Sequence, residues 1–391
     1  MNIIRILSPS GFECPTMKSI GKMIGSCFVL VCALTVSGCG DGTGEDEESE
    51  TRRTATYRIT MVDQDLSYTR AGSEVFKHHV ETATDGDMTV TLLPWGAVGT
   101  DREVIDQLRL GELEVVNATT PGLTGVIPEV QAYNLPFLFP DRITAWTLML
   151  DPAHVAFIRE HWLERSGNTL RFLGAAENAI RHMYTTRGPI RTPADLTEHR
   201  IVMRTMEAPL YVSLFEALGV RSVLTIPAAE RYTALQTGMI DGTEGGLASA
   251  WEAGLLEVSE YVSLTGHMFD YHWYVVNNDF YKSLPERYRE IVGEAALLAV
   301  FTQNVAAMRE SDQALTEMRK AGRQVYQPTA DELSQWREIG REHGLAYMSR
   351  ELSTEYLDTV MEAVEAAHER IEAYHGRHAT PSNDSARELD E

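Results

Sequence analysis

The sequence predicts an α/β fold of two domains, and three observations lead to this prediction. The chain has 391 residues, a length typical of two domains of ordinary size. From Tyr57 onwards, short apolar runs of strand type alternate with helical patterns. From Pro285 the pattern becomes strongly helical. Alternation of this kind favours a mostly parallel sheet, with ligands bound beyond the carboxyl ends of its strands.

The first half of the chain supplies four predicted strands and three predicted helices. The strands are TYRITMV (56–62), MTVTLLP (88–94), LEVVNA (113–118) and LRFLGAAEN (170–178). The helices run through AGSEVFKHHVETA (71–83), TDREVIDQLRLGE (100–112) and ITAWTLML (143–150). Thr100 is the expected N-cap of the second helix, because its hydroxyl can accept from a free backbone N–H. The prolines of segment 130–140 predict a loop or an edge segment.

The second half repeats the alternation and then turns helical. Strands are predicted over 200–204 and 220–226, and helices over 210–219 and 227–237. In the next stretch, Gly238 is expected to cap a helix, Met239–Ile240 to form a brief strand and Asp241–Gly242 to turn the chain. One long helix is predicted over 285–322, followed by helices over 331–348 and 353–375.

The N-terminal segment predicts export and a lipid anchor. Lys18 and Lys22 precede the apolar run 24–36, which is shorter than the roughly 20 residues that span a bilayer. Ser37-Gly38-Cys39 resembles a bacterial lipobox, so residues 17–38 are predicted to be a lipoprotein signal and Cys39 the lipidated residue. An ordinary signal peptide with a chance cysteine is the alternative. Residues 39–55 read as an acidic tether and residues 376–391 as a disordered tail.

Composition excludes several classes of function. The net charge of −23 argues against nucleic acid as a partner, although a single buried arginine can still bind a small anion. All four cysteines lie in the first 39 residues, so the rest of the chain has no thiolate for a metal site. Its histidines lack metal-ligand spacing, and the sequence contains no GxGxxG, GxxxxGK[ST], GxSxG or HExxH motif. We therefore expect no cofactor and no metal.

Several segments taken together resemble the solute-binding proteins of tripartite ATP-independent periplasmic (TRAP) transporters. They are GAVGTDREVIDQLRLGELEV (96–115), NLPFLFPD (134–141), ENAIRHMYTTRGPIRTPADL (177–196), RTMEAPLYVSLFEALGV (204–220), ERYTALQTGMIDGTEG (230–245) and LTGHMFDYHWYVVNNDFYKSLPE (264–286). The resemblance covers roughly residues 57–370 and implies a two-domain periplasmic solute-binding protein fold, with a hinge and a long helix spanning both domains. It places domain I at 56–178 plus about 268–305, and domain II at 179–267 plus about 306–375.

The resemblance also implies the residues that bind the ligand. Arg204 matches the arginine that clamps the ligand carboxylate in this family, and Arg200 is its rival because the count from Asp195-Leu196 shifts by two residues. A guanidinium suits this role, since it binds a carboxylate in bidentate fashion. Arg181 matches a second family arginine, which either contacts the ligand or positions the first; a hinge salt bridge is the alternative.

The glycine-rich end of TALQTGMIDGTEGG (233–246) departs from the family pattern. An asparagine of the family is replaced here, in the run Thr243-Glu244-Gly245-Gly246, and Glu244 and Gly245 are expected near the ligand. Further candidates for the wall of the ligand site are Thr119, His272, Trp273 and Trp251, together with Tyr271. Packing in the core is the other interpretation of the aromatic residues.

The resemblance implies a non-enzymatic receptor that binds a small organic acid by hinge closure. Such a receptor is periplasmic, a monomer by default, and delivers its ligand to sodium-coupled membrane permease subunits. The lipid on Cys39 is expected to hold it at a bacterial membrane. A periplasmic lyase or hydrolase, or a ligand-sensing subunit, on the same scaffold are the alternatives.

Overall fold

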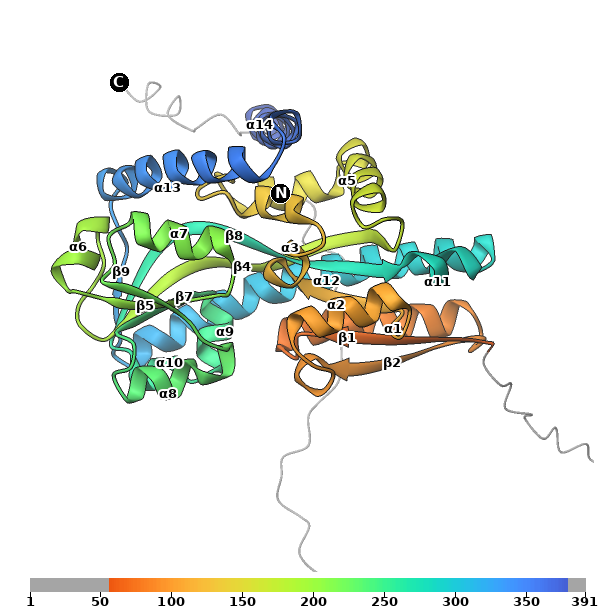
Figure 1. The fold of residues 1–391 in the computed structure, drawn as a ribbon, viewed down its shortest axis with the longest axis horizontal. Helices are drawn as coiled ribbons and strands as arrows, with labels where there is room; N and C mark the ends of the chain where they lie inside the picture. Colours follow the sequence, from red (N-terminus) through yellow and green to blue (C-terminus); the bar gives the residue numbers. More distant parts are fainter. Residues whose placement is uncertain (1–55, 379–391) are drawn as a thin grey trace, which may run out of the picture. The chain divides into compact units, whose positions relative to one another are not determined.

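A single nine-stranded mixed sheet organises the part of the chain that the computed structural model describes, residues 56–378 (Figure 1). The predicted signal, Cys39 and the tether lie outside these residues, as does the tail beyond His378. The strands are β1 (Tyr57–Asp63), β2 (Met88–Pro94), β3 (Val115–Thr119), β4 (Leu170–Thr185), β5 (Val202–Thr205), β6 (Ser222–Thr225), β7 (Gly242–Gly245), β8 (Tyr261–Asn277) and β9 (Gln324–Tyr326). Their order is β2-β1-β3-β8-β4-β7-β5-β6, with β9 paired to β8.

Two long strands are shared by both halves of this sheet. β4 and β8 run antiparallel over 16 and 17 residues, from Leu170 opposite Asn277 to Thr185 opposite Tyr261. β3 pairs with one end of β8, at Val275 and Val276 among others, and β7 pairs with the opposite end of β4. β8 is antiparallel to β3 and to β4, and β4 is antiparallel to β7. The sheet is therefore mixed, whereas the sequence predicted a mostly parallel sheet.

The first of these strands extends beyond its predicted end, and the second was not predicted as a strand. We expected a strand over 170–178, but β4 continues through Arg181 to Thr185. Polar residues such as Glu177 and Asp270 interrupt the apolar pattern in β4 and β8, although both are fully buried. Their partners lie far away in the sequence, which is why the pattern alone does not show that the strands continue.

Seventeen helical segments, counted within residues 56–378, cover the sheet. The longer ones are α1 (Ser67–Ala83), α2 (Asp101–Leu110), α4 (Arg142–Leu150), α5 (Pro152–Arg165), α7 (Pro209–Ala217), α12 (Glu286–Lys320), α13 (Ala330–Glu351) and α14 (Thr354–His378). The shorter ones are η1 (Trp95–Ala97), α3 (Thr120–Thr124), η2 (Pro128–Asn134), α6 (Pro193–Glu198), η3 (Ala228–Glu230), α8 (Arg231–Gln236), α9 (Leu247–Glu252), α10 (Leu255–Val258) and α11 (Asn278–Ser283).

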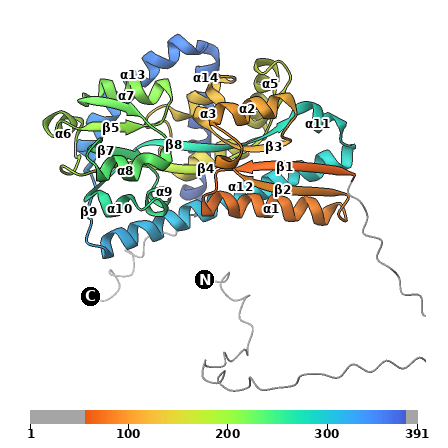
Figure 2. The same cartoon turned by 60° about the horizontal axis from the view of Figure 1, so that its bottom comes forward.

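The long helix predicted over 285–322 is α12, and it connects the two halves of the fold. It runs along one side of the sheet past β9, α9, β4 and α1 (Figure 2). By length and composition it is the one described helix that passes as a candidate membrane span, but 56% of its apolar window is buried inside the protein. Its approach to α1 is close, since a Cβ atom on Gly72 would lie 2.5 Å from Oη of Tyr274 and 2.9 Å from the Ala299 carbonyl.

Local predictions differ in outcome. Thr100 caps α2 as predicted, because its Oγ1 accepts from the Glu103 N–H at 3.4 Å. The brief strand at Met239–Ile240 is wrong: the strand is β7, which begins only at Gly242, after Gly238 has taken a positive φ of 72°. α14 continues to His378, so the first three residues of the predicted tail are helical.

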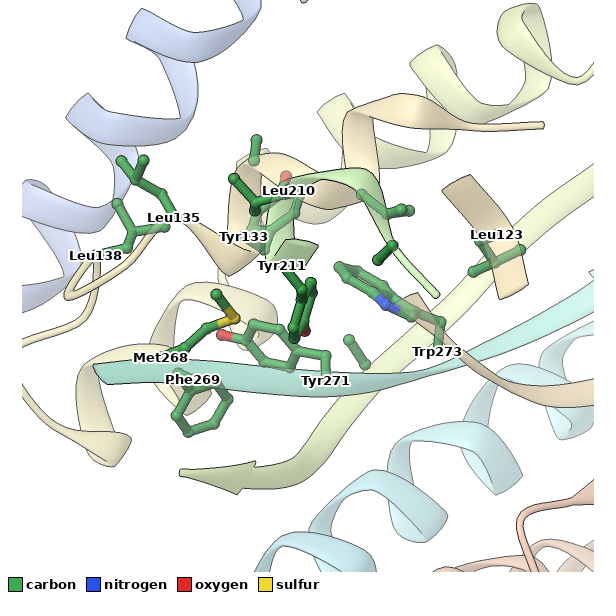
Figure 3. Close-up of a cluster of buried hydrophobic side chains, with 14 of the residues drawn as sticks. Leu123, Tyr133, Leu135, Leu138, Leu210, Tyr211, Met268, Phe269, Tyr271 and Trp273 are labelled. Carbon is green, nitrogen blue, oxygen red and sulfur yellow. The ribbon is translucent and has the colours of Figure 1, made fainter. Parts of the chain in front are cut away.

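Aromatic side chains fill the core between β8 and the helices above it (Figure 3). The ring centroid of Trp273 lies 5.4 Å from those of Tyr133, Trp162 and Tyr271. Trp273 Nε1 donates to Thr120 Oγ1 at 3.0 Å, and Tyr271 Oη donates to the Ala145 carbonyl at 2.9 Å. Both rings therefore have their polar atoms satisfied within the core.

Candidate functional site

A buried ion pair joins β4 to β7 at the centre of the candidate site. Arg181 is 4% exposed and Glu244 is fully buried. The guanidinium binds the carboxylate in bidentate fashion, with Nε 2.5 Å from Oε2 and Nη2 2.8 Å from Oε1. Thr205 Oγ1 donates to the same carboxylate at 2.9 Å. Arg181 thus makes the salt bridge that the sequence left as its alternative role.

Asp270 on β8 is the second carboxylate bound to Arg181. Its Oδ2 accepts from Nη1 of Arg181 at 2.8 Å and from Nδ2 of Asn178 at 3.0 Å. Its Oδ1 accepts from Thr120 at 3.2 Å and from Asn134 at 3.1 Å. Four donors around one buried carboxylate fix both Asp270 and the guanidinium that it contacts.

Burial and charge act in opposite directions on this cluster. Burial alone raises the pKa of Glu244, but the charge and hydrogen bonds of Arg181, with a contribution from the His267 side chain, hold it well below its usual value. Burial likewise opposes the charge on Arg181, but Glu244 and Asp270 carry its pKa well above the usual range. Burial lowers the pKa of His267, which lies 3.8 Å from Glu244. The site therefore holds a charged arginine with two carboxylates.

Arg204 on β5 is buried without a carboxylate partner. It is 4% exposed, and its Nε donates to the Ile226 carbonyl at 2.9 Å. Among the described residues no carboxylate lies within ion-pair distance of its guanidinium. Burial, followed by the charge of Arg231, lowers the pKa of Arg204 to about 9. Its rival Arg200 is exposed and precedes β5, so only Arg204 shares the buried region with Arg181.

Arg231, at the start of α8, is a further buried arginine that sequence reasoning missed. It is 8% exposed, and its Nε donates to the Ala228 carbonyl at 3.1 Å. It too lacks an ion-pair partner within residues 56–378. Burial, followed by the charge of Arg181, lowers its pKa. An ideal Cβ atom on Gly245 would lie 3.4 Å from its Nη1. The only sequence signal for this contact is the missing side chain at Gly245, because the two residues are far apart in the chain.

Two hydroxyl groups beside these arginines have no hydrogen-bond partner among the described residues. They are Tyr184 Oη and Thr243 Oγ1, on fully buried residues. Thr243 lies opposite Tyr184 across the β4–β7 pair and opposite Arg204 across the β5–β7 pair. Side chains in register on adjacent strands leave the same face of a sheet, so these three groups share one face.

The predicted wall residues are placed in different surroundings. Thr119 is 6% exposed and serves as the N-cap of α3, where its Oγ1 accepts from Gly122 and donates to Asp101 at 3.0 Å. His272 lies opposite Thr119 in the sheet, stacks on Tyr68 and contacts Gln303 at 3.3 Å. Burial lowers the pKa of His272 to about 3, so the imidazole is neutral at pH 7.

The two predicted tryptophans do not join the arginine cluster. Trp273 is fully buried in the aromatic core. Tyr271 belongs to the same core. Trp251 on α9 is 41% exposed, since it lies on the outer side of a short helix. Trp273 and Tyr271 therefore have the surroundings of core residues, as the alternative interpretation of the aromatic residues describes.

No group of three or more His, Cys, Asp or Glu side chains within residues 56–378 has an arrangement that could hold a metal ion. A cavity of about 510 Å³ lies elsewhere, between the 137–141 segment, β8 and α13. Arg181, Arg204 and Arg231 do not line this cavity. Their region is distinguished by its buried positive charge.

Comparison with known proteins gives one family. The model of the bacterial extracellular solute-binding proteins, family 7, matches residues 59–349. The 2,3-diketo-L-gulonate-binding periplasmic protein YiaO of Escherichia coli is 27% identical over 250 residues, which cover 64% of this chain and 74% of that protein. The ectoine/5-hydroxyectoine-binding periplasmic protein UehA of Ruegeria pomeroyi is 27% identical over 301 residues, 74% of this chain and 82% of that protein.

A solved structure agrees with this match. The TRAP periplasmic solute-binding protein of Ochrobactrum anthropi, which has its C-terminus bound in the ligand-binding pocket, superposes with a TM-score of 0.73. It is 25% identical, and the match covers 81% of this chain and 97% of that one.

Proposed function

Because the chain belongs to family 7 of the bacterial extracellular solute-binding proteins, we propose that it is the solute receptor of a TRAP transporter and binds a small organic acid through Arg204. The observation that carries this proposal is the burial of Arg204 without a carboxylate partner. A buried charge without a counter-ion costs several kcal/mol, roughly 3–5 when a pair is broken. A ligand carboxylate removes that cost, and the planar guanidinium can bind it in bidentate fashion.

Arg181 has a positioning role in this proposal. Its ion pairs with Glu244 and Asp270 use its nitrogens, so it orders the site instead of clamping the ligand. Glu244 serves the same end, and its neighbour Gly245 leaves the backbone free of a side chain beside the ligand. Thr119 and His272 lie opposite each other on β3 and β8, within domain I. The surroundings of Trp251 and Trp273 do not support a role for either residue as a ligand contact.

Binding is proposed to close a hinge between two domains. Domain I comprises 56–178 plus about 268–305, and domain II comprises 179–267 plus about 306–375. The two boundaries within the sheet fall inside β4 and β8. β3 pairs with one end of β8, and β7 pairs with the opposite end of β4. A strand pair that passes through both domains can bend without separating them, as hinge closure requires.

The remaining parts of the proposal concern the cellular setting. The protein is a periplasmic monomer, held at the membrane by a lipid on Cys39, and passes its ligand to permease subunits without chemical change. Periplasmic names among the relatives support the compartment. A Cys39→Ser variant is expected to leave the membrane fraction, and the ligand is expected to be recovered unaltered after incubation.

Calorimetric titration of the purified protein with a panel of organic acids tests the binding function. Arg204→Ala should weaken binding by about two to three orders of magnitude, on the cost given above. Arg200→Gln is the matched control, since Arg200 is exposed and should leave the affinity unchanged. Equal loss in both variants, or no loss in Arg204→Ala, would show that Arg204 is not the clamp.

A further inference from the structure

Three buried arginines and two buried carboxylates lie on β4, β5, β7, β8 and α8 at the candidate site, and their charges do not balance. Arg181 is paired with both Glu244 and Asp270. Arg204 and Arg231 each donate one Nε hydrogen bond to a backbone carbonyl, which orients the guanidinium but leaves its charge uncompensated. His267, whose Nε2 lies 3.8 Å from Glu244, is neutral at pH 7 because burial lowers its pKa. One positive charge therefore remains after all five groups are counted.

The two arginines without ion pairs lie close to each other. Arg204 lies opposite Thr243 of β7, and the Cβ position of Gly245, two residues further along that strand, lies 3.4 Å from Nη1 of Arg231. Gly245 directly follows Glu244 on β7. A side chain at this position would extend toward the guanidinium, so glycine keeps the space beside Nη1 open. Two like charges held this close without a counter-ion repel, and an anion bound between them relieves the repulsion.

We propose that Arg231 is a second ligand-binding arginine, which holds the ligand anion jointly with Arg204 and excludes ligands that carry a positive group. This inference rests on the proposed function and narrows its ligand class. The charge balance favours a monoanion, which brings the five protein groups and the ligand to neutrality. The hydroxyls of Tyr184 and Thr243, both buried without partners, favour a ligand with hydroxyl or carbonyl oxygens beside its carboxylate. The ligand class is thus a hydroxy or keto monocarboxylate.

A zwitterionic ligand does not suit this arrangement. Its cationic group would have to be accommodated in a region that already carries excess positive charge, and the desolvated setting makes like-charge repulsion strong. A dicarboxylate would bind with its second charge unbalanced, unless that group stays in contact with water. Arg231 therefore acts as a specificity-determining residue and not only as a source of affinity.

Thermal-shift and calorimetric titrations of the wild-type protein, Arg231→Gln, Arg204→Gln and Arg221→Gln test the proposal. The probes are D-galactonate and 2,3-diketo-L-gulonate as hydroxy and keto monocarboxylates, succinate as a dicarboxylate and ectoine as a zwitterion. Arg221 is the matched control, because it is an exposed arginine next to β6 in the same half of the fold. We expect at least one monocarboxylate to bind, Arg231→Gln and Arg204→Gln each to weaken it at least ten-fold, and Arg221→Gln to match the wild type.

A second readout separates a binding role from a structural one. Without ligand, Arg231→Gln should melt at the same or a higher temperature than the wild type, because it removes an uncompensated buried charge. A structural arginine would instead give a lower melting temperature and an unchanged affinity, and that result would overturn the proposal. If Arg231→Gln does not fold, Arg231→Lys keeps the charge but loses the planar fork, and it should still weaken binding several-fold.

The possible failures are distinguishable. If Arg231→Gln binds like the wild type while Arg204→Gln does not, Arg231 is not a ligand residue but the receptor function stands. Binding of ectoine as tight as that of the best monocarboxylate would refute the charge argument alone. If the wild type binds none of the carboxylates, both the ligand class and the proposed receptor function for organic acids are wrong.

Discussion

Nη1 of Arg181 donates to Oδ2 of Asp270 at 2.8 Å, and this contact joins two runs of hydrogen bonds into one. From Asp270 the run continues through Asn178 to Oη of Tyr68 on α1. From Arg181 it continues through Glu244 to Thr205 on β5. Groups from both halves of the sheet are therefore held by one guanidinium, which couples the geometry of the ligand site to the packing of α1.

Removal of Arg181 should destabilise the whole fold. Arg181→Ala leaves Glu244 and Asp270 buried without their cation, so we expect a loss of about 3–5 kcal/mol in the free energy of unfolding, measured by urea denaturation. Arg187→Ala is the control, because its ion pair with Asp241 involves an arginine that is 49% exposed. That variant should lose less than about 1 kcal/mol. Similar losses in the two variants would contradict the structural role of Arg181.

Stability should depend on the charge of Glu177. Burial raises the pKa of this carboxyl to about 7, although Arg142 and Trp146 partly oppose the shift. The folded state then binds the proton more tightly than the unfolded state, so this group makes stability fall as the pH rises from about 4.5 to 7. Below about pH 4.5 the carboxyl is protonated in both the folded and the unfolded state, so Glu177 does not make stability depend on pH there. The full effect is about 3 kcal/mol, by the free energy of one pKa unit.

Glu177→Gln should remove this dependence. The variant keeps an acceptor for Trp146 Nε1, which donates to Glu177 Oε2 at 2.9 Å, but it has no proton to lose. Urea unfolding at several pH values between 4.5 and 8 should therefore give a flatter profile for the variant and a higher stability at pH 7.5. Parallel profiles for the two proteins would show that Glu177 does not titrate in this window.

Two helix glycines should respond in opposite ways to alanine. Gly72→Ala places a methyl group 2.5 Å from Tyr274 Oη and should cost about 1–3 kcal/mol through overpacking of α1 against α12. Gly293, inside α12, has no atom within 4 Å of its Cβ position, so Gly293→Ala should stabilise by about 0.4–1 kcal/mol. Thermal unfolding measures both, and a stabilising Gly72→Ala would show that α1 and α12 pack less closely.

The fork of Arg204 should matter separately from its charge. Arg204→Lys retains a cation but loses one of two parallel hydrogen bonds to a ligand carboxylate, each worth about 1.5–3 kcal/mol. We expect the affinity for the bound organic acid to fall about ten- to a hundred-fold in calorimetric titration. An unchanged affinity would mean that the ligand anion is held as a point charge.

The elements with strong periodicity could be predicted from the sequence, and those defined by distant contacts could not. α12 and the Thr100 cap follow from local patterns in the chain. The continuation of β4 past Asn178 does not, because Asp270 and Glu244 stabilise its polar residues from other strands. The strand expected at Met239–Ile240 begins at Gly242 because β7 is defined by its partners β4 and β5.

The candidate site was likewise predictable only in part, where a local sequence pattern marks its residues. Arg181, Arg204 and Glu244 lie in segments whose family resemblance is readable in the sequence, and the structure brings them together. Arg231 also lies in one of these segments, 230–245, but its significance depends on burial and on the absence of a side chain at Gly245, which the segment itself does not reveal. The surroundings of Trp273 could not be predicted, because a large aromatic residue looks the same in the sequence whether it lines a core or a ligand site.

The two long central strands have a consequence for how the chain acquires its structure. Each half of the sheet needs β4 and β8, but the residues of β8 are separated from those of β3 by more than a hundred positions. No N-terminal fragment that ends before residue 261 contains a complete half, so neither domain is a contiguous piece that can fold by itself. Pairings this distant in sequence slow folding, since the loops must close before the contacts form. We therefore expect one cooperative unfolding transition and no independently stable domain.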